Sequence, residues 1–290
     1  AFCDCVNLTA ASFPACQIIY VGAFSGCIRL SVVHFPQCTQ IGNTAFGRCS
    51  SLTTAIFPEC TAIQPNAFSG CTSLTSISLP KCTFIGFSVF ARCSKLTSVT
   101  LPECSTIDLS AFAYCSALSS VVFSKCTEIS MYAFYNCSAL TSIGLPICKS
   151  IGSSAFYGCT ALATISLPSC TSLGSYAFYN CPALATISHP YCTSIGSYAF
   201  GYCTALATIS LPYCTSIENY AFYNCKSLSA IYLMGSHFCS ISSVSAFMNT
   251  PISNSTYLGT FGSIYVPSSM LASYKTQVGF SNYSARLVGI

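Results

Sequence analysis

Hydrophobic residues recur in this chain with a period of 22 positions. Three consecutive segments read LATISLPSCTSLGSYAFYNCPA (162–183), LATISHPYCTSIGSYAFGYCTA (184–205) and LATISLPYCTSIENYAFYNCKS (206–227). The same frame runs back without an insertion, and its complete rungs begin at Leu8, Leu30, Leu52, Leu74, Leu96, Leu118, Leu140, Leu162, Leu184 and Leu206. Repeats of this length are typical of a solenoid, because each rung buries its apolar side only when another rung stacks on it.

The first half of each rung predicts a β-strand. Leu162, Ile165 and Leu167 follow the spacing L-x-x-I-x-L, and the last two lie two positions apart, which is the strand period. Both therefore point inward, while Thr164 and Ser166 point outward. The proline that follows in most rungs ends the strand, because it has no N–H to donate to a ladder.

The second half of the rung returns the chain through the back of the coil. Leu173 and then the pair Ala177 and Phe178 supply its apolar positions, and Gly174 is predicted at the bend between them. We expect irregular segments or short helical turns on this side of the coil.

The strand motif L-x-x-I-x-L-P, the I-G turn and the A-F-x-x-C return resemble the BspA-like, Treponema-type leucine-rich repeats of bacterial and some protist surface proteins. The resemblance covers roughly residues 1–250. It implies a β-rich α/β fold, a right-handed leucine-rich-repeat solenoid with a parallel sheet on its concave face. It also implies surface exposure and adhesion or ligand binding, without naming a ligand. One departure is that the family's rung is usually a residue longer and lacks the cysteine after Leu-Pro.

Two parts are predicted along the chain. Residues 1–250 form the solenoid, with a truncated first rung and a degenerate last one, and residues 251–290 resemble the family's closing module. There, GSIYVP (262–267) predicts a strand and SSMLASYKTQ (268–277) a helix, with Ser268 or Ser269 as its N-cap. No signal peptide is present and the chain starts inside a repeat, so we treat it as a fragment or a mature form.

Cysteine recurs every 11 residues from Cys5 to Cys225, which is half a rung and therefore places two columns along the solenoid. Cys3 and Cys239 are additional. Three states compete for the 23 cysteines: buried thiols acting as small hydrophobes, disulfides between rungs, and metal ligands. We favour buried thiols that bond the nearby backbone, with disulfides only at isolated places such as Cys3 or Cys239. We expect no metal and no cofactor, since no Cys or His cluster has zinc-ligand spacing.

Composition excludes several classes of function. Charged residues make up only 6% of the chain, none lies between Ser150 and Ile217, and the net charge is +4. This charge is too weak and too scattered for nucleic acid. No run of about 18 apolar residues is present to span a membrane. No nucleophile–base–acid set and no glycine-rich phosphate loop is indicated, so we predict that the protein is not an enzyme.

A few polar residues depart from the hydroxyl-rich background. Glu59, Lys81, Glu103 and Lys125 occupy the same position in successive rungs with alternating sign, which predicts a solvated charge ladder. His189 replaces the inward leucine of its rung, and a histidine in a core column is usually a neutral imidazole with a hydrogen-bond partner.

The outward strand positions predict an extended hydroxyl-rich face of about eleven strands, roughly 50 Å long. Sixteen of the 18 tyrosines follow Ile129, and tyrosine is enriched at recognition surfaces. The candidate ligand-binding residues are Thr164, Ser166, Thr186, Ser188, Tyr191, Thr208, Ser210, Tyr213 and Tyr232. The alternative is that repeat duplication copied tyrosine into stacks on the return side, as at Tyr176, Tyr198 and Tyr220.

The leading hypothesis is an extracellular or cell-surface module that binds a protein or glycan of a host or a neighbouring cell. A structural stalk that displays another domain is the second hypothesis. An intracellular inhibitor with reduced cysteines and an ice-binding protein with regular Thr and Ser rows are further alternatives.

Overall fold

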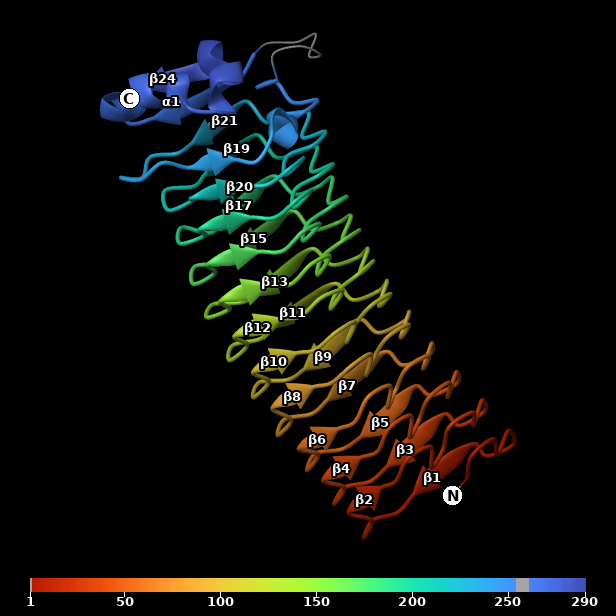
Figure 1. Cartoon of the computed structure of the whole chain (residues 1–290). Coiled ribbons are helices and arrows are strands. Elements are labelled where there is room, and N and C mark those ends of the chain that lie inside the picture. Colours follow the sequence, from red (N-terminus) through yellow and green to blue (C-terminus); the bar gives the residue numbers. More distant parts are fainter. Residues whose placement is uncertain (1, 254–260) are drawn as a thin grey trace. The chain divides into compact units, whose positions relative to one another are not determined.

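The structure, a computed structural model, describes residues 2–253 and 261–290. It forms two compact units, residues 1–145 and residues 146–290, which we call the N-terminal and C-terminal units (Figure 1). Each unit is a stack of β-solenoid coils with parallel strands. Part of the predicted closing module, residues 254–260, lies outside the described residues. The predicted division of the chain near residue 250 stays a prediction.

The predicted strand is present in every coil of the N-terminal unit. These strands are β1 (Ala10–Ser12), β3 (Val32–His34), β5 (Thr54–Ile56), β7 (Ser76–Ser78), β9 (Ser98–Thr100), β11 (Ser120–Val122) and β13 (Ser142–Gly144). They pair in parallel as β1-β3-β5-β7-β9 and as β11-β13. The partners lie one repeat apart, as in the pairs Ala10↔Val32 and Ser120↔Ser142. The sequence period therefore sets the register of the sheet.

Each coil also has a second strand, on the side where only irregular returns were predicted. In the N-terminal unit these strands are β2 (Ile18–Ile19), β4 (Gln40–Ile41), β6 (Ala62–Ile63), β8 (Phe84–Ile85), β10 (Thr106–Ile107) and β12 (Glu128–Ile129). They form a second parallel ladder in chain order. The inward isoleucine is β-branched and suits extended backbone, so a two-residue strand interrupts the irregular return that the sequence predicted.

The C-terminal unit repeats this arrangement. Its first strands are β15 (Thr164–Ser166), β17 (Thr186–Ser188), β19 (Thr208–Ser210) and β21 (Ala230–Tyr232). Its second strands are β14 (Ser150–Ile151), β16 (Ser172–Leu173), β18 (Ser194–Ile195), β20 (Ser216–Ile217) and β22 (Ser240–Ile241). β15 pairs with β17, and β19-β21 continues into β23 (Ser263–Val266) and β24 (Leu287–Gly289). The predicted strand at 262–267 is thus confirmed.

The C-terminal helices are short. They are η1 (Val244–Phe247), η2 (Ser268–Met270), α1 (Leu271–Thr276) and η3 (Phe280–Arg286). The helix predicted at 268–277 is present, but neither Ser268 nor Ser269 is its N-cap. Pro267 holds the cap position of η2 with extended backbone, and neither η2 nor α1 has a side-chain cap bond. The chain enters the helical turn directly from the proline, so both serines lie inside the first turn.

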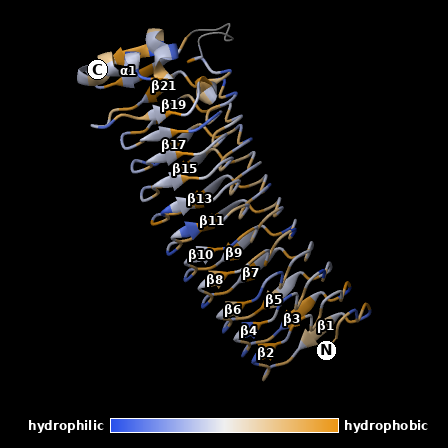
Figure 2. Cartoon of the chain, in the orientation of Figure 1, coloured by the Kyte–Doolittle hydropathy of each residue, from blue (hydrophilic) through white to orange (hydrophobic). Residues whose placement is uncertain are grey.

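Inward columns of Leu, Ile, Phe and Cys form the core, as predicted. Figure 2 shows hydrophobic residues recurring along successive coils of each unit. In the C-terminal unit the rings of Phe156, Phe178 and Phe200 stack with centroid separations of 5.3 and 5.6 Å. Stacked rings of this size bury a large apolar area, which contributes strongly to coil stacking.

Both cysteine columns point inward and bond the backbone. In the first column, Cys170 Sγ donates to the carbonyl of Ser172 at 3.2 Å. In the second, Cys181 Sγ donates to the carbonyl of Phe156 in the preceding coil at 3.1 Å. All 23 cysteines lie within the described residues as free thiols, and burial raises the pKa of Cys181 to about 12. The buried thiols are therefore neutral, weakly donating hydrophobes.

Most coils turn through two residues with positive φ that lie four positions apart. In the C-terminal unit these pairs include Tyr176 with Asn180 and Tyr198 with Tyr202, all with φ between 55° and 61°. The predicted bend residue Gly174 is required for a different reason. A Cβ there would lie 2.6 Å from the backbone nitrogen of Ser153, so glycine permits the close approach of two coils.

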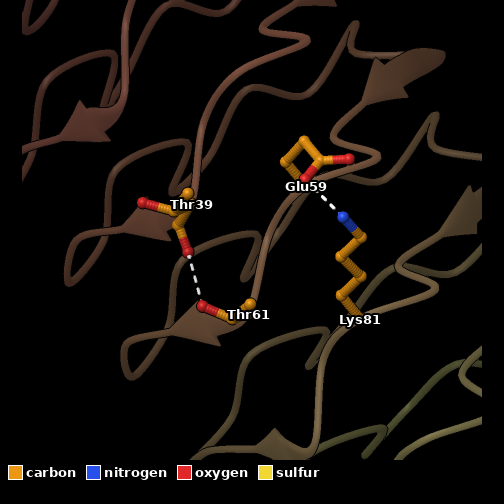
Figure 3. Close-up of polar contacts among 4 residues, drawn as sticks. All are labelled: Thr39, Glu59, Thr61 and Lys81. Carbon is orange, nitrogen blue, oxygen red and sulfur yellow. Dashed lines mark hydrogen bonds and ion pairs between the residues drawn. The ribbon is translucent and has the colours of Figure 1, made fainter.

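Polar side chains connect neighbouring coils at the surface. Thr61 Oγ1 donates to the carbonyl of Thr39 at 3.2 Å, and Lys81 pairs with Glu59 (Figure 3). The four residues of the predicted charge ladder form two exposed ion pairs. In the second pair, Lys125 Nζ lies 2.5 Å from Glu103 Oε2. Exposed pairs of this kind contribute about 1 kcal/mol or less each.

Candidate functional site

The predicted hydroxyl rows lie on the exposed face of the first strands in the C-terminal unit. Thr164 pairs in register with Thr186, and Ser166 with Ser188. All four side chains are exposed, while Ile165 between them is buried. Because strand residues alternate between faces, the sequence pattern placed these residues correctly.

The next strand continues the same pattern with an interruption. Thr208 and Ser210 of β19 are exposed and pair with Ala230 and Tyr232 of β21. In the described part of the chain, however, no ladder joins β17 to β19. The predicted continuous sheet is therefore a series of separate ladders, and the hydroxyl rows belong to two of them.

None of these six hydroxyl groups (Thr164, Ser166, Thr186, Ser188, Thr208 and Ser210) forms a side-chain hydrogen bond among the described residues. Threonines beside the second strands behave differently. Thr193 Oγ1 donates to the carbonyl of Thr171, and Thr215 Oγ1 donates to the carbonyl of Thr193, both at 3.0 Å. The hydroxyl rows of the first strands are thus free to donate to a partner, whereas those beside the second strands are already engaged.

Two of the three predicted tyrosines form an exposed ring pair. Tyr191 and Tyr213 each follow the proline that ends a first strand, and their ring centroids lie 5.6 Å apart with planes tilted by 31°. Their exposed fractions are 54% and 47%. The ring of His237 lies 6.4 Å from that of Tyr213. Large aromatic side chains that remain this exposed offer contact area without contributing to the core.

The third predicted tyrosine belongs to a different pair. Tyr232 is half-buried and stacks on Tyr265, with centroids 4.7 Å apart and planes within 10°. The two residues are register partners on β21 and β23. Sequence reasoning missed Tyr265 because a longer insertion separates β21 from β23 and breaks the 22-residue frame. The three predicted tyrosines therefore belong to two separate ring pairs, Tyr191–Tyr213 and Tyr232–Tyr265.

His189 lies buried directly after β17, with 2% of its surface exposed. Burial lowers its pKa from 6.5 to about 4, so the imidazole is neutral, as predicted. Neither ring nitrogen has a hydrogen-bond partner among the described residues, so the expectation of a partnered histidine was wrong. The surrounding column is apolar, and the nearest ring contact is the edge-on packing of Phe200 at 6.2 Å.

A second group of tyrosines stacks on the return side of the C-terminal unit. The rings of Tyr176, Tyr198 and Tyr220 form one row with centroid separations of 4.9 and 4.7 Å. Tyr179 and Tyr202 belong to a neighbouring row, with centroids 5.2 Å apart. The return-side stacks that the repeat pattern indicated are thus present, and the stacking of these rings on one another gives them a packing role.

The described residues contain no group of three or more His, Cys, Asp or Glu side chains that could hold a metal ion. Among them there is also no helix that has both the length and the hydropathy needed to cross a membrane. No Asp, Glu, Lys or Arg is present in the sequence between Ser150 and Ile217. The candidate face is therefore electrically neutral, and hydroxyl groups and phenol rings supply its chemistry.

A profile of the BspA type leucine-rich repeat region matches residues 1–119 and 127–254 in six copies. The chain belongs to the BspA-type leucine-rich-repeat family. This match confirms the resemblance that the strand, turn and return motifs indicated. Nothing in the family or in the fold indicates an enzyme.

Solved structures of bacterial leucine-rich-repeat proteins share the fold of this BspA-type chain. A leucine-rich cell surface protein of Faecalibacterium prausnitzii is 26% identical, with a TM-score of 0.53, covering 98% of this chain and 83% of its own. A leucine-rich repeat protein of Bacteroides ovatus is 24% identical, with a TM-score of 0.55, covering 99% and 85%. The pneumococcal vaccine antigen PcpA is 17% identical, with a TM-score of 0.51, covering 97% and 87%. No curated protein sequence matches.

The family and its cell-surface neighbours point to a protein of the surface or the exterior of a cell that binds other molecules. They do not identify the residues that make contact. The choice of candidate residues is therefore based on the geometry of the C-terminal unit.

Proposed function

We propose that this chain is the binding module of a secreted or cell-surface protein and that it has no catalytic role. Its partner is a protein or glycan of a host or neighbouring cell, contacted through the exposed first-strand face of the C-terminal unit. The proposed contact residues are the six unbonded hydroxyl residues of β15, β17 and β19, together with Tyr191, Tyr213 and Tyr232.

The observation that carries this proposal is the exposed Tyr191–Tyr213 ring pair beside hydroxyl groups that have no internal partner. Tyrosine provides a large, rigid contact area with little loss of conformational entropy, and free hydroxyl groups supply adaptable hydrogen bonds. Because the face is uncharged, we expect binding that changes little with salt concentration.

The test is to probe glycan and protein arrays with the purified chain and to repeat the measurement with the double variant Tyr191→Ala/Tyr213→Ala. We expect the double variant to lose at least about tenfold in affinity, since buried aromatic anchors dominate most interfaces. Adding Tyr232→Ala extends the test to the second ring pair.

The matched control is Tyr198→Ala/Tyr220→Ala, which removes two stacked rings from the return side of the same coils. It should leave binding unchanged. Unchanged binding in Tyr191→Ala/Tyr213→Ala would remove the proposed site, and loss of binding only in the control would move the site to the return side.

A structural stalk is the second candidate function. The continuous stacks of Phe and Tyr rings favour it, because they connect successive coils without requiring a ligand. A stalk should bind nothing on either array.

A further inference from the structure

Cys239 departs from the pattern of the other core thiols. In the regular column, Cys192 donates to the carbonyl of Ser194 at 3.2 Å, and Cys214 to that of Ser216 at 3.3 Å. Cys239 has only a long contact of 3.6 Å to the carbonyl of Ser240. Its sulfur instead lies 3.7 Å from the sulfur of Cys214.

A change of register explains this placement. β20 pairs with β22 through Ser216↔Ser240, a step of 24 residues where the other second strands step by 22. This step aligns Cys239 with the exposed Thr215 and not with the column cysteine Cys214. Cys239 is nevertheless buried, and its thiol lies against that of Cys214.

The C-terminal helix covers this pair. The backbone N–H of Cys239 donates to the hydroxyl of Tyr274 at 2.9 Å, and the Tyr274 ring packs against Phe238 at 5.1 Å. Tyr274 is fully buried, and Cys214 and Cys239 are 3% and 1% exposed. The two sulfurs are thus held together in a closed, apolar site at the junction of β20, β22 and α1.

We propose that Cys214 and Cys239 are a specific oxidation site and form a disulfide that fastens the last coil to the one before it. The oxidant is a low-molecular-weight or protein disulfide. One thiolate attacks the external disulfide, forming a mixed disulfide and releasing one thiol. The second thiolate then attacks the mixed disulfide and releases the other thiol. The chain loses two protons and two electrons, and the external disulfide gains them.

The geometry needs only a small adjustment. The sulfurs must move from 3.7 Å to about 2.05 Å, a distance within reach of side-chain rotation and a slight approach of the coils. The hydrogen bond to Cys214, together with burial, raises the pKa of Cys239, so the attacking thiolate forms when the last coil opens. Formation is therefore slow in the closed state, and the product is shielded from reductants once the coil closes again.

The test treats the intact, reduced chain with dithiodipyridine, a small aromatic disulfide. The remaining thiols are then alkylated under denaturing conditions, and the peptides are mapped by mass spectrometry without reductant. We expect one linked peptide pair that contains Cys214 and Cys239. The oxidised chain should also unfold at a higher temperature than the reduced chain.

Two variants provide the controls. Cys239→Ser should abolish both the linked pair and the thermal shift, whereas Cys192→Ser, which removes a regular column thiol, should retain both. The exposed Cys3 and Cys5 report that the reagent is active. The proposal is overturned if Cys214 and Cys239 are recovered alkylated or as separate pyridyl adducts in the wild-type map. A link between Cys192 and Cys214 in their place would overturn it equally.

Discussion

Cys181 donates its thiol hydrogen to the carbonyl of Phe156, 25 residues earlier and one coil away. The same bond recurs along the column, as from Cys203 to Phe178. Each thiol thus satisfies a buried carbonyl of the neighbouring coil as well as filling space. Cysteine suits this position because it is small and apolar and still carries a weak donor.

Replacing Cys181 with alanine should lower the free energy of unfolding by about 1–2 kcal/mol. The change removes the bond to Phe156 and leaves a small void in the core. Denaturant titration measures the difference. Cys3→Ala, at an exposed position, should change the stability by about 0.5 kcal/mol or less. Equal effects of the two substitutions would show that the column bond contributes nothing measurable.

His189→Leu should raise the free energy of unfolding by about 1–3 kcal/mol at neutral pH. The substitution restores the leucine column and removes a buried imidazole whose nitrogens have no partner. Thermal or denaturant unfolding at pH 7 provides the measurement, and destabilisation by leucine would contradict it.

Because of His189, the free energy of unfolding of the wild-type chain should also decrease as the pH is lowered. Its folded pKa is about 4 against 6.5 ordinarily, so the unfolded state binds more protons between these values. Stability is then fully present above about pH 6.5 and declines toward pH 4, by up to about 3 kcal/mol. A pH series of unfolding curves for the wild type and His189→Leu should show this extra decline only in the wild type.

Arg48→Gly should stabilise the N-terminal unit by about 1 kcal/mol. Arg48 is exposed with φ of 61°, a left-handed conformation that costs L-residues energy and that glycine adopts freely. Lys95→Gly, at an exposed position without positive φ, should instead destabilise the unit slightly. Stabilisation by both substitutions, or by neither, would show that backbone strain at Arg48 is not the cause.

Phe178→Ala should cost about 3–5 kcal/mol because it removes a fully buried ring from the phenylalanine stack. Tyr191→Ala should cost about 0.5 kcal/mol or less because half of its side chain is exposed. Thermal unfolding distinguishes the two. A large loss of stability in Tyr191→Ala would mean that reduced binding by that variant reflects unfolding.

The sequence period was sufficient to predict the solenoid, the inward columns and the register of the first strands. Alternation within L-x-x-I-x-L determined which side chains face outward, and Thr164 and Ser166 are exposed as expected. The second strands were missed because two residues such as Ser172–Leu173 are too short to show alternation. The left-handed turn positions were missed because Tyr, Asn, Ser, Arg and Thr together occupy them more often than Gly.

Other features depend on distances that the repeat alone does not encode. The stacking of Tyr232 on Tyr265 requires the register between β21 and β23, which the 22-residue period does not give. The approach of Cys239 to Cys214 requires the two-residue slip in the last coil. His189 could be placed in the core from its column, but its lack of a hydrogen-bond partner depends on which atoms of the neighbouring coils reach its ring nitrogens.

The threonines beside the second strands give the C-terminal unit two chemically unequal surfaces. The hydroxyl groups of Thr193 and Thr215 already donate their hydrogens to carbonyls of the adjoining coil. To a ligand they can therefore act only as hydrogen-bond acceptors. A molecule rich in acceptor oxygens finds no donor in these hydroxyls, while Thr164 and Ser188 on the other surface can both give and receive. Two rows of nearly identical residues can therefore discriminate between ligands that need a hydrogen-bond donor and ligands that need an acceptor, although neither row is charged.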